Sequence, residues 1–339
     1  MCRETVQWRV PAPSRWSGFQ LETIRLKALV RIVYHPAVAS QQEMVTDQVT
    51  QFYRSLPFNY EGTVEEACRT IHAGNQIAAA YPTLDAILAC AKQGVVLDVG
   101  CGAGWFVNTV AYHYGLDAVG VDLCEPAIDR AQAVCKRLSL HGRVRYACAD
   151  LFQLQSTQLT RTNEFCLVNS IGVLHHTHDC REALRSVAAL VEPNGFIHIG
   201  LYHRYGRQPF LDLFQPYRET YNNGTSEAAR QAIEQQAFHL YRTLHPFTDE
   251  TLLRSWFRDQ VFHPHESQHT LQDLYGWLTD MGFQCLSTSI NSFQTVHNWD
   301  ALFEEEKKMY ELSYQRNVRE KKYFPGFFTV IAQRYSQSS

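Results

Sequence analysis

The segment VLDVGCGAG (residues 96–104) combines one acidic residue with three closely spaced glycines. Asp98 lies two positions before Gly100, and Gly102 and Gly104 follow at alternate positions. Because glycine has no Cβ, a turn built from glycines accepts unusual backbone conformations and lets a ligand lie against the main chain. Where such a turn leads into a helix, the ligand also meets free N–H groups. The segment therefore predicts a ligand-binding turn, although glycines at this spacing also serve in purely structural turns.

Two more aspartates end predicted strands further along the chain. Asp122 ends the apolar run 117–123, about 20 residues after the first glycine, the spacing at which a carboxylate accepts both hydroxyls of a ribose. Asp150 ends the run 144–150, where it can accept from an adenine amino group. Either aspartate can instead cap a helix N-terminus. The pattern predicts an adenosine-containing ligand, and Asp122 alone does not distinguish NAD from S-adenosylmethionine.

Strand and helix patterns alternate from residue 95 onward and would position these side chains. Strands are expected at 95–100, 117–123, 144–150, 165–174 and 195–203, with helices between them at 104–114, 126–138 and 179–191, the last stopped by Pro193, Asn194 and Gly195. Such alternation predicts right-handed crossovers and a doubly wound α/β fold. In these sheets, ligands bind outside the carboxyl ends of the strands.

The remaining segments suggest a division of the chain. We expect an uncertain extension at 1–40, a helical N-terminal cap at 41–94, a cofactor-binding core at 95–203, a helical insertion or substrate lid at 204–269, and completion of the sheet by 270–339 with strands at 284–290 and 327–334. The extension is either a targeting segment or an over-extension of the gene upstream of Met44.

Taken together and in order, the motifs resemble those of the class I S-adenosylmethionine-dependent methyltransferases, especially the small-molecule branch that includes ubiquinone-biosynthesis-like and type 11 and 12 enzymes. VLDVGCGAG resembles motif I, AVGVDL the acidic-loop motif, YACADLF the adenine motif, NSIGVLHHTHD the segment after strand four, and ALVEPNGFIHIG the helix and strand that follow. The resemblance covers roughly residues 90–203. It implies a Rossmann-like sheet of seven strands, six parallel and the last antiparallel.

The resemblance also implies a cofactor, S-adenosyl-L-methionine, and a role for each matching position. Asp98, Gly100, Gly102 and Gly104 would hold the methionine portion, Asp122 the ribose, Leu123, Asp150 and Leu151 the adenine, and Asn169 and Ser170 would line the cofactor edge. The expected activity is methyl transfer to a small molecule. A tRNA-nucleoside methyltransferase and a non-catalytic S-adenosylmethionine-binding protein are the alternatives, whereas Asp98 and Asp150 argue against a nicotinamide dehydrogenase.

Histidine suits the removal of a proton from an acceptor near pH 7. His175 and His176 follow the fourth predicted strand and His203 ends the fifth, so all three are candidate catalytic residues at the carboxyl edge. Structural hydrogen bonding is the alternative for each. The segment FHPHESQH (262–269) contains three histidines and a glutamate, but Pro264 breaks its helical spacing, and no metal is expected.

Composition excludes several other classes. The net charge of −3 lacks the basic surplus typical of nucleic-acid binding, which argues against a nucleic-acid partner. None of the ten cysteines forms a C-x-x-C pair, which favours reduced thiols and a cytoplasmic location. No apolar run reaches the roughly 20 residues of a membrane helix. The oligomeric state is left open.

Overall fold

A computed structural model describes residues 41–55, 57–58, 62–91, 93–156, 164–224 and 226–335. The expected extension at 1–40 lies outside these residues. Within them, seven strands form one sheet in the order β3-β2-β1-β4-β5-β7-β6. The strands are β1 Val95–Val99, β2 Asp117–Asp122, β3 Val144–Cys148, β4 Phe165–Ile171, β5 Val191–Tyr202, β6 Phe283–Thr288 and β7 Phe327–Arg334.

The sheet has the predicted mixture of directions. Strands β1 to β5 pair in parallel, whereas β7 lies between β5 and β6 and runs antiparallel to both. The doubly wound class with six parallel strands and one antiparallel strand is therefore confirmed. The strand order reverses between β1 and β4, and this switch point is where such sheets open a crevice at their carboxyl edge.

Helices cover both faces of the sheet because alternate strand residues point to opposite faces. On one face, Val96 packs with apolar residues of α2 Val64–Ala73, α3 Gln76–Ala80, α4 Pro82–Cys90, α5 Trp105–Tyr114 and α6 Glu125–Arg137. On the other face, Leu97 and Val99 pack with α7 Cys180–Ala188, α11 Leu271–Asp280 and α12 Trp299–Glu306. These two cores hold the carboxyl edge of the sheet in place.

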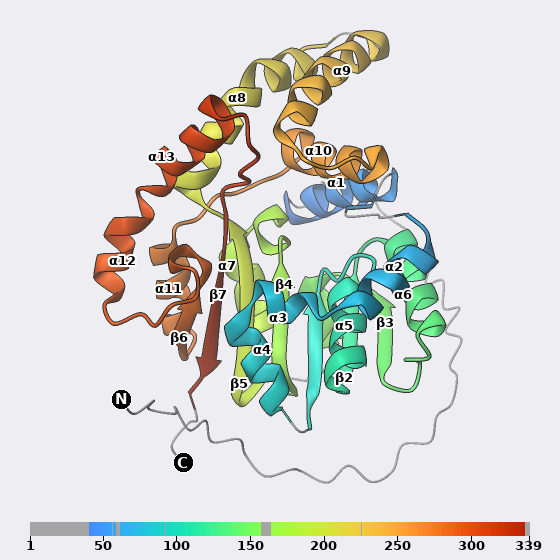
Figure 1. The fold of residues 1–339 in the computed structure, drawn as a ribbon, viewed down its shortest axis with the longest axis vertical. Helices are drawn as coiled ribbons and strands as arrows, with labels where there is room; N and C mark the ends of the chain where they lie inside the picture. Colours follow the sequence, from blue (N-terminus) through green and yellow to red (C-terminus); the bar gives the residue numbers. More distant parts are fainter. Residues whose placement is uncertain are drawn as a thin grey trace.

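A separate group of helices stands over that edge (Figure 1). It comprises α8 Arg204–Asn222, α9 Glu227–Leu244 and α10 Glu250–Phe262, which share an aromatic core around Phe214, Tyr241 and Phe257. Helix α1 Gln41–Ser55, from the start of the described chain, lies beside α10 (Figure 1). None of the helices in the described ranges is long and apolar enough to span a membrane.

Strand β5 begins earlier than predicted. Strand β5 begins at Val191 rather than at 195, because Val191 pairs with Phe165 before a shift in the ladder, and Asn194 takes a positive φ of 63°. The residues PNG are thus part of an irregular strand instead of a break before it. Further along the chain, α12 and the short helix α13 Met309–Ser313 are followed by a π-helical turn.

A buried ion pair joins the helical group to the sheet. Arg207 of α8 is fully buried, and its Nε and Nη2 donate to the two carboxylate oxygens of Glu266 at 2.9 and 2.8 Å. Nη2 also donates to the carbonyl of Gln260 at 2.6 Å, and the guanidinium lies 3.9 Å from the ring centre of Tyr202. The pair therefore links α8, the end of α10, the 263–269 loop and β5.

Replacing Arg207 with methionine would leave Glu266 buried without its cation. We expect the Arg207→Met change to lower the free energy of unfolding by about 3–5 kcal/mol, the cost of breaking a buried pair. The matched change Arg204→Met removes an exposed pair with Asp273 and should cost less than about 1 kcal/mol. Urea denaturation of both variants measures the difference, and equal losses would contradict the assigned role of the pair.

Candidate functional site

The glycine turn after β1 is bound to the end of β2. The N–H groups of Gly100 and Cys101 donate to the carbonyl of Val121 at 2.7 and 3.0 Å. The Asp122 carboxylate accepts from the N–H of Gly102 through one oxygen and from that of Cys124 through the other, both at 2.8 Å. Burial raises the pKa of Asp122, while these N–H groups act in the opposite direction. The carboxylate keeps further lone pairs for a ligand.

The three glycines of the turn have positive φ angles but different surroundings. A Cβ on Gly100 would collide with the side chain of Val173, and one on Gly104 would collide with Tyr146 and Ala131. A Cβ on Gly102 would meet nothing within 4 Å. Gly100 and Gly104 therefore permit close packing, whereas Gly102 presents its backbone to open space.

A row of polar side chains crosses three neighbouring strands. Asp98, Asn169 and His198 are in register on β1, β4 and β5. Asn169 Nδ2 donates to Asp98 Oδ1 at 2.7 Å, and His198 Nδ1 lies 2.8 Å from Asn169 Oδ1, so Nδ1 must carry the imidazole proton. Burial raises the pKa of Asp98 to about 7 and lowers that of His198 to about 3. His198 was not among the predicted site residues, although its alternation with Gly200 and Tyr202 along β5 places it on this face.

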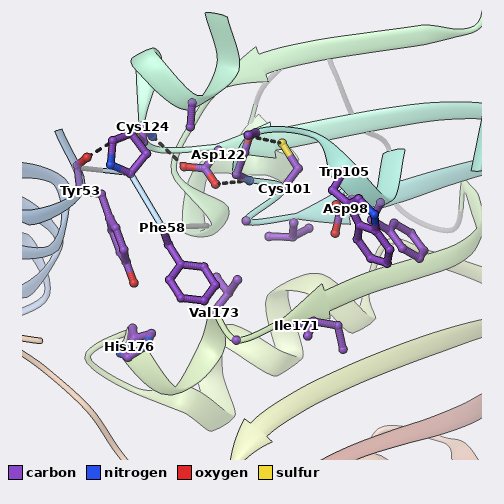
Figure 2. A pocket seen from close by; sticks show the side chains of 18 of the residues that line it. Tyr53, Phe58, Asp98, Cys101, Trp105, Asp122, Cys124, Ile171, Val173 and His176 are labelled. Atoms are coloured by element: carbon purple, nitrogen blue, oxygen red, sulfur yellow. Dashed lines mark hydrogen bonds between the residues drawn. The ribbon is translucent and has the colours of Figure 1, made fainter. Parts of the chain in front are cut away.

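One cavity of about 660 Å³ opens at these strand ends. Of the predicted cofactor-binding residues, its wall includes Asp98, Gly100, Gly102, Asp122, Leu123, Asp150, Leu151 and Asn169. Figure 2 shows Asp122 and His176 on different parts of the wall with Phe58 between them. Gly104 and Ser170 are not on the wall. The hydroxyl of Ser170 is buried and donates to the carbonyl of Val99 at 3.1 Å.

Asp150 caps a short helical turn and also lies on the cavity wall. One of its oxygens accepts from the N–H of Phe152 at 2.9 Å and so caps the short helical turn Leu151–Ser156. The residue also lines the cavity. The capping role is therefore present in the structure, and a second role toward a ligand stays a prediction.

Two of the three predicted catalytic histidines lie on the cavity wall. His175 and His176 belong to the turn Leu174–His176 that follows β4. His175 is fully buried, its ring centre is 4.3 Å from that of Tyr202, and neither of its ring nitrogens has a partner among the described residues. Burial lowers the pKa of His175 well below its usual value, so the ring is neutral at pH 7.

The third candidate, His203, lies away from the other two. His203 is fully buried and is not on the cavity wall. Its Nδ1 accepts from the N–H of Gly206 at 3.0 Å, so its Nε2 donates to the Glu306 carboxylate at 2.7 Å. Both nitrogens are engaged, and the residue caps the start of α8.

Sequence reasoning also missed a carboxylate at the histidine end of the cavity. Asp259 of α10 is buried on the wall, where it accepts from the hydroxyl of Tyr53 of α1 at 2.5 Å and from that of Tyr202 of β5 at 3.3 Å. Burial raises the pKa of all three groups. Tyr53 and Asp259 are 206 residues apart, and no local pattern reports such a contact.

A family model described as a methyltransferase domain matches residues 96–195. The chain is 24% identical over 261 residues to an uncharacterized protein of Synechococcus, covering 74% of this chain and 62% of that protein. It is 30% identical over 109 residues to the ubiquinone biosynthesis O-methyltransferase of Coxiella burnetii, covering 32% and 44%. The chain thus spans about half to three-fifths of the length of these relatives.

Among solved structures, PKMT2 of Rickettsia typhi in complex with AdoHcy superposes with a TM-score of 0.52 at 13% identity, covering 77% of this chain and 54% of that one. At this identity, the match supports the fold alone.

The unequal surroundings of the glycines generate a prediction. Gly100→Ala and Gly102→Ala both place a Cβ at positive φ, which costs about 1–2 kcal/mol. Gly100→Ala adds a collision with Val173, so we expect a further loss of about 1–3 kcal/mol in the free energy of unfolding. Denaturant unfolding of the two variants tests this order, and a larger loss for Gly102→Ala would refute it.

Proposed function

We propose that this chain, whose residues 96–195 form a methyltransferase domain of the class I S-adenosylmethionine-dependent type, transfers a methyl group from that cofactor to a small-molecule acceptor. One observation supports the proposal most directly. The same cavity is lined at one end by Asp122 and the glycine turn and at the other end, called the acceptor end, by His175 and His176. A bound cofactor and a bound acceptor would therefore share one cavity.

The residues at the first end fit the cofactor. Asp122 has lone pairs left for two ribose hydroxyls, and the apolar side chains of Leu123 and Leu151 suit an adenine ring. Gly102 borders open space that a side chain would fill. Asp98 offers a carboxylate to an ammonium group, which is what the methionine portion carries.

S-adenosylmethionine, when bound, supplies an activated methyl group and its own leaving group. The contribution of the chain is to align the acceptor with that methyl group and to exclude water. We assign the second task to the predicted cap and lid, because Val45 and Val49 of α1 and Trp256 of α10 line the cavity from above the sheet edge.

His175 is the residue we place nearest the acceptor's proton. Its ring is neutral and buried, and an unpartnered ring nitrogen is costly unless a ligand or water engages it. It can therefore accept a hydrogen bond from an acceptor hydroxyl or amine. His176, which also lines the cavity, has one ring nitrogen bound to a backbone carbonyl and is available through the other.

The acceptor end favours a small, largely apolar molecule. Phe58, Trp256, Tyr323 and Phe327 contribute aromatic surface to the wall there. The cavity volume of about 660 Å³ is within the range of small-molecule pockets. With a net charge of −3 for the whole chain, these features favour a small organic acceptor over a nucleic acid.

Calorimetric titration with S-adenosylmethionine tests the cofactor assignment. We expect Asp122→Asn to weaken binding by about 10- to 100-fold, because hydrogen bonds to a charged group contribute about 1.5–3 kcal/mol. Asp117→Asn, at the exposed opposite end of β2, should bind like the unmodified protein. Absence of S-adenosylmethionine binding, or tighter binding of NAD, would overturn the proposal.

The raised pKa of Asp98 predicts that cofactor binding depends on pH. The ionised carboxylate attracts an ammonium group, and in the free protein it is protonated below a pKa of about 7. Affinity should therefore fall as the pH decreases below 7, approaching about tenfold per pH unit. Titrations between about pH 5.5 and 7.5 measure this, and Asp98→Asn should give weaker binding with a flatter profile. An equal slope in both proteins would exclude Asp98 as the source.

A further inference from the structure

Three potential metal ligands meet at the acceptor end of the cavity. His176, Asp259 and His263 are all buried, and one ligand atom from each lies within 4.8 Å of the other two. We propose that these residues bind a divalent transition-metal ion of the zinc class. The sequence pattern alone predicts no metal here, because only the fold brings His176 to the other two residues.

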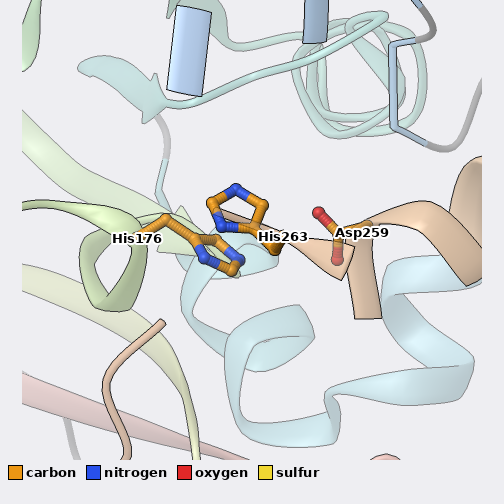
Figure 3. Close-up of side chains that lie close together, drawn as sticks. All are labelled: His176, Asp259 and His263. Atoms are coloured by element: carbon orange, nitrogen blue, oxygen red, sulfur yellow. The ribbon is translucent and has the colours of Figure 1, made fainter. Parts of the chain in front are cut away.

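Two structural elements supply the three ligands. Asp259 and His263 are four residues apart at the end of α10, a spacing that places two side chains on one helix face. Pro264 follows directly, where the helix ends. His176 approaches from the turn after β4, and its ring centre lies 3.7 Å from that of His263. Figure 3 shows the two rings overlapping and the Asp259 carboxylate facing them.

Hydrogen bonds to His176 and Asp259 orient these two side chains and leave each with a lone pair for a cation. His176 Nδ1 lies 2.8 Å from the carbonyl of His265, so Nδ1 carries the proton and Nε2 keeps its lone pair. Metal-binding histidines are commonly oriented by such a second hydrogen bond. The hydroxyls of Tyr53 and Tyr202 hold the Asp259 carboxylate in the same manner.

The third ligand, His263, contains an unsatisfied atom. Its Nδ1 accepts from the N–H of His265 at 3.1 Å, and its buried Nε2 has no partner among the described residues. Binding an ion through Nε2 moves the ring proton to Nδ1 and gives up that one hydrogen bond. The exchange replaces a single neutral hydrogen bond and an unpartnered buried nitrogen with a metal–nitrogen bond.

The ligand types select the ion. Two imidazoles and one carboxylate suit Zn²⁺ and its neighbours such as Co²⁺, whereas Mg²⁺ and Ca²⁺ prefer sets of oxygen ligands. Three protein ligands leave a fourth position, and His176 and Asp259 both line the cavity. If the proposed function holds, that position would receive the oxygen, nitrogen or sulfur of the acceptor and favour its deprotonated form. Binding of the ion itself does not depend on the proposed function.

The first experiment titrates metal-stripped protein with Zn²⁺ in competition with a chromophoric chelator. We expect the protein to bind one equivalent of Zn²⁺ tightly. The changes His176→Gln, Asp259→Asn and His263→Gln should each weaken Zn²⁺ binding by more than about 100-fold, which exceeds the loss typical for a residue that only hydrogen-bonds to a metal ligand. His245→Gln is the matched control, because His245 is also a histidine with buried, unpartnered ring nitrogens but stacks on Tyr323 away from this cluster. Weak binding by the unmodified protein, or equal binding by His263→Gln, overturns the proposal.

Absorption spectra of the Co²⁺-loaded protein provide a second measurement that needs no variant to fold. Tetrahedral nitrogen and oxygen ligation gives visible d–d bands without a thiolate charge-transfer band. A thiolate band would instead place the ion on cysteines such as the exposed Cys90 or Cys148 and overturn the assignment. Calorimetry of the metal-stripped protein with S-adenosylmethionine separates the two proposals. A protein that binds S-adenosylmethionine but no Zn²⁺ refutes only the metal site, whereas a protein that binds Zn²⁺ but no S-adenosylmethionine, with or without the metal, refutes only the proposed function.

Discussion

The Asp122 carboxylate is the contact on which the geometry of the cavity depends. By accepting from Gly102 and Cys124, it binds the glycine turn and the start of the β2–α6 connection to one point, while the carbonyl of Val121 receives two more N–H groups. The turn can then keep conformations that glycine accepts more readily than other residues, with its backbone at the edge of open space. A ligand would find these groups already in position and would not have to order them.

Burial determines the chemistry of the remaining wall. Polar groups inside a protein are normally hydrogen-bonded, and Asp98, Asn169 and His198 satisfy one another across three strands. Some buried polar atoms without a partner among the described residues, such as the ring nitrogens of His175 and Nε2 of His198, lie on the cavity wall, whereas others, such as those of His245 and Asn291, do not. Burial also keeps these imidazoles neutral while it raises the pKa of nearby carboxyl groups. The unpartnered nitrogens of His175 and His198 are therefore in positions where a ligand in the cavity can engage them.

The sequence predicted well what depends on neighbouring residues. The β1 strand, the glycine turn and Asp122 are local features, and the structure places them as expected, although their roles toward a cofactor stay predictions. No local pattern shows that His203 lies off the cavity wall with its ring bound to Glu306, about a hundred residues later in the chain. For the same reason, the sequence could not predict the contact between Tyr53 and Asp259, which belong to helices far apart in the chain. Position in a motif thus identified the strand edge, but it could not show which side chains reach the open space.

The place of β7 in the sheet has a consequence for the order in which the chain folds. Strand β6 pairs only with β7 among the described strands, and β7 in turn pairs with β5. A nascent chain can therefore assemble β1 to β5 as they emerge, but β6 has no template in the sheet until β7 has been synthesised and has paired against β5. Until then β5 presents an unpaired strand edge, the kind of surface that recruits other chains. The interval before β7 pairs with β5 is thus the stage of folding at which an unpaired strand edge exposes this protein to aggregation.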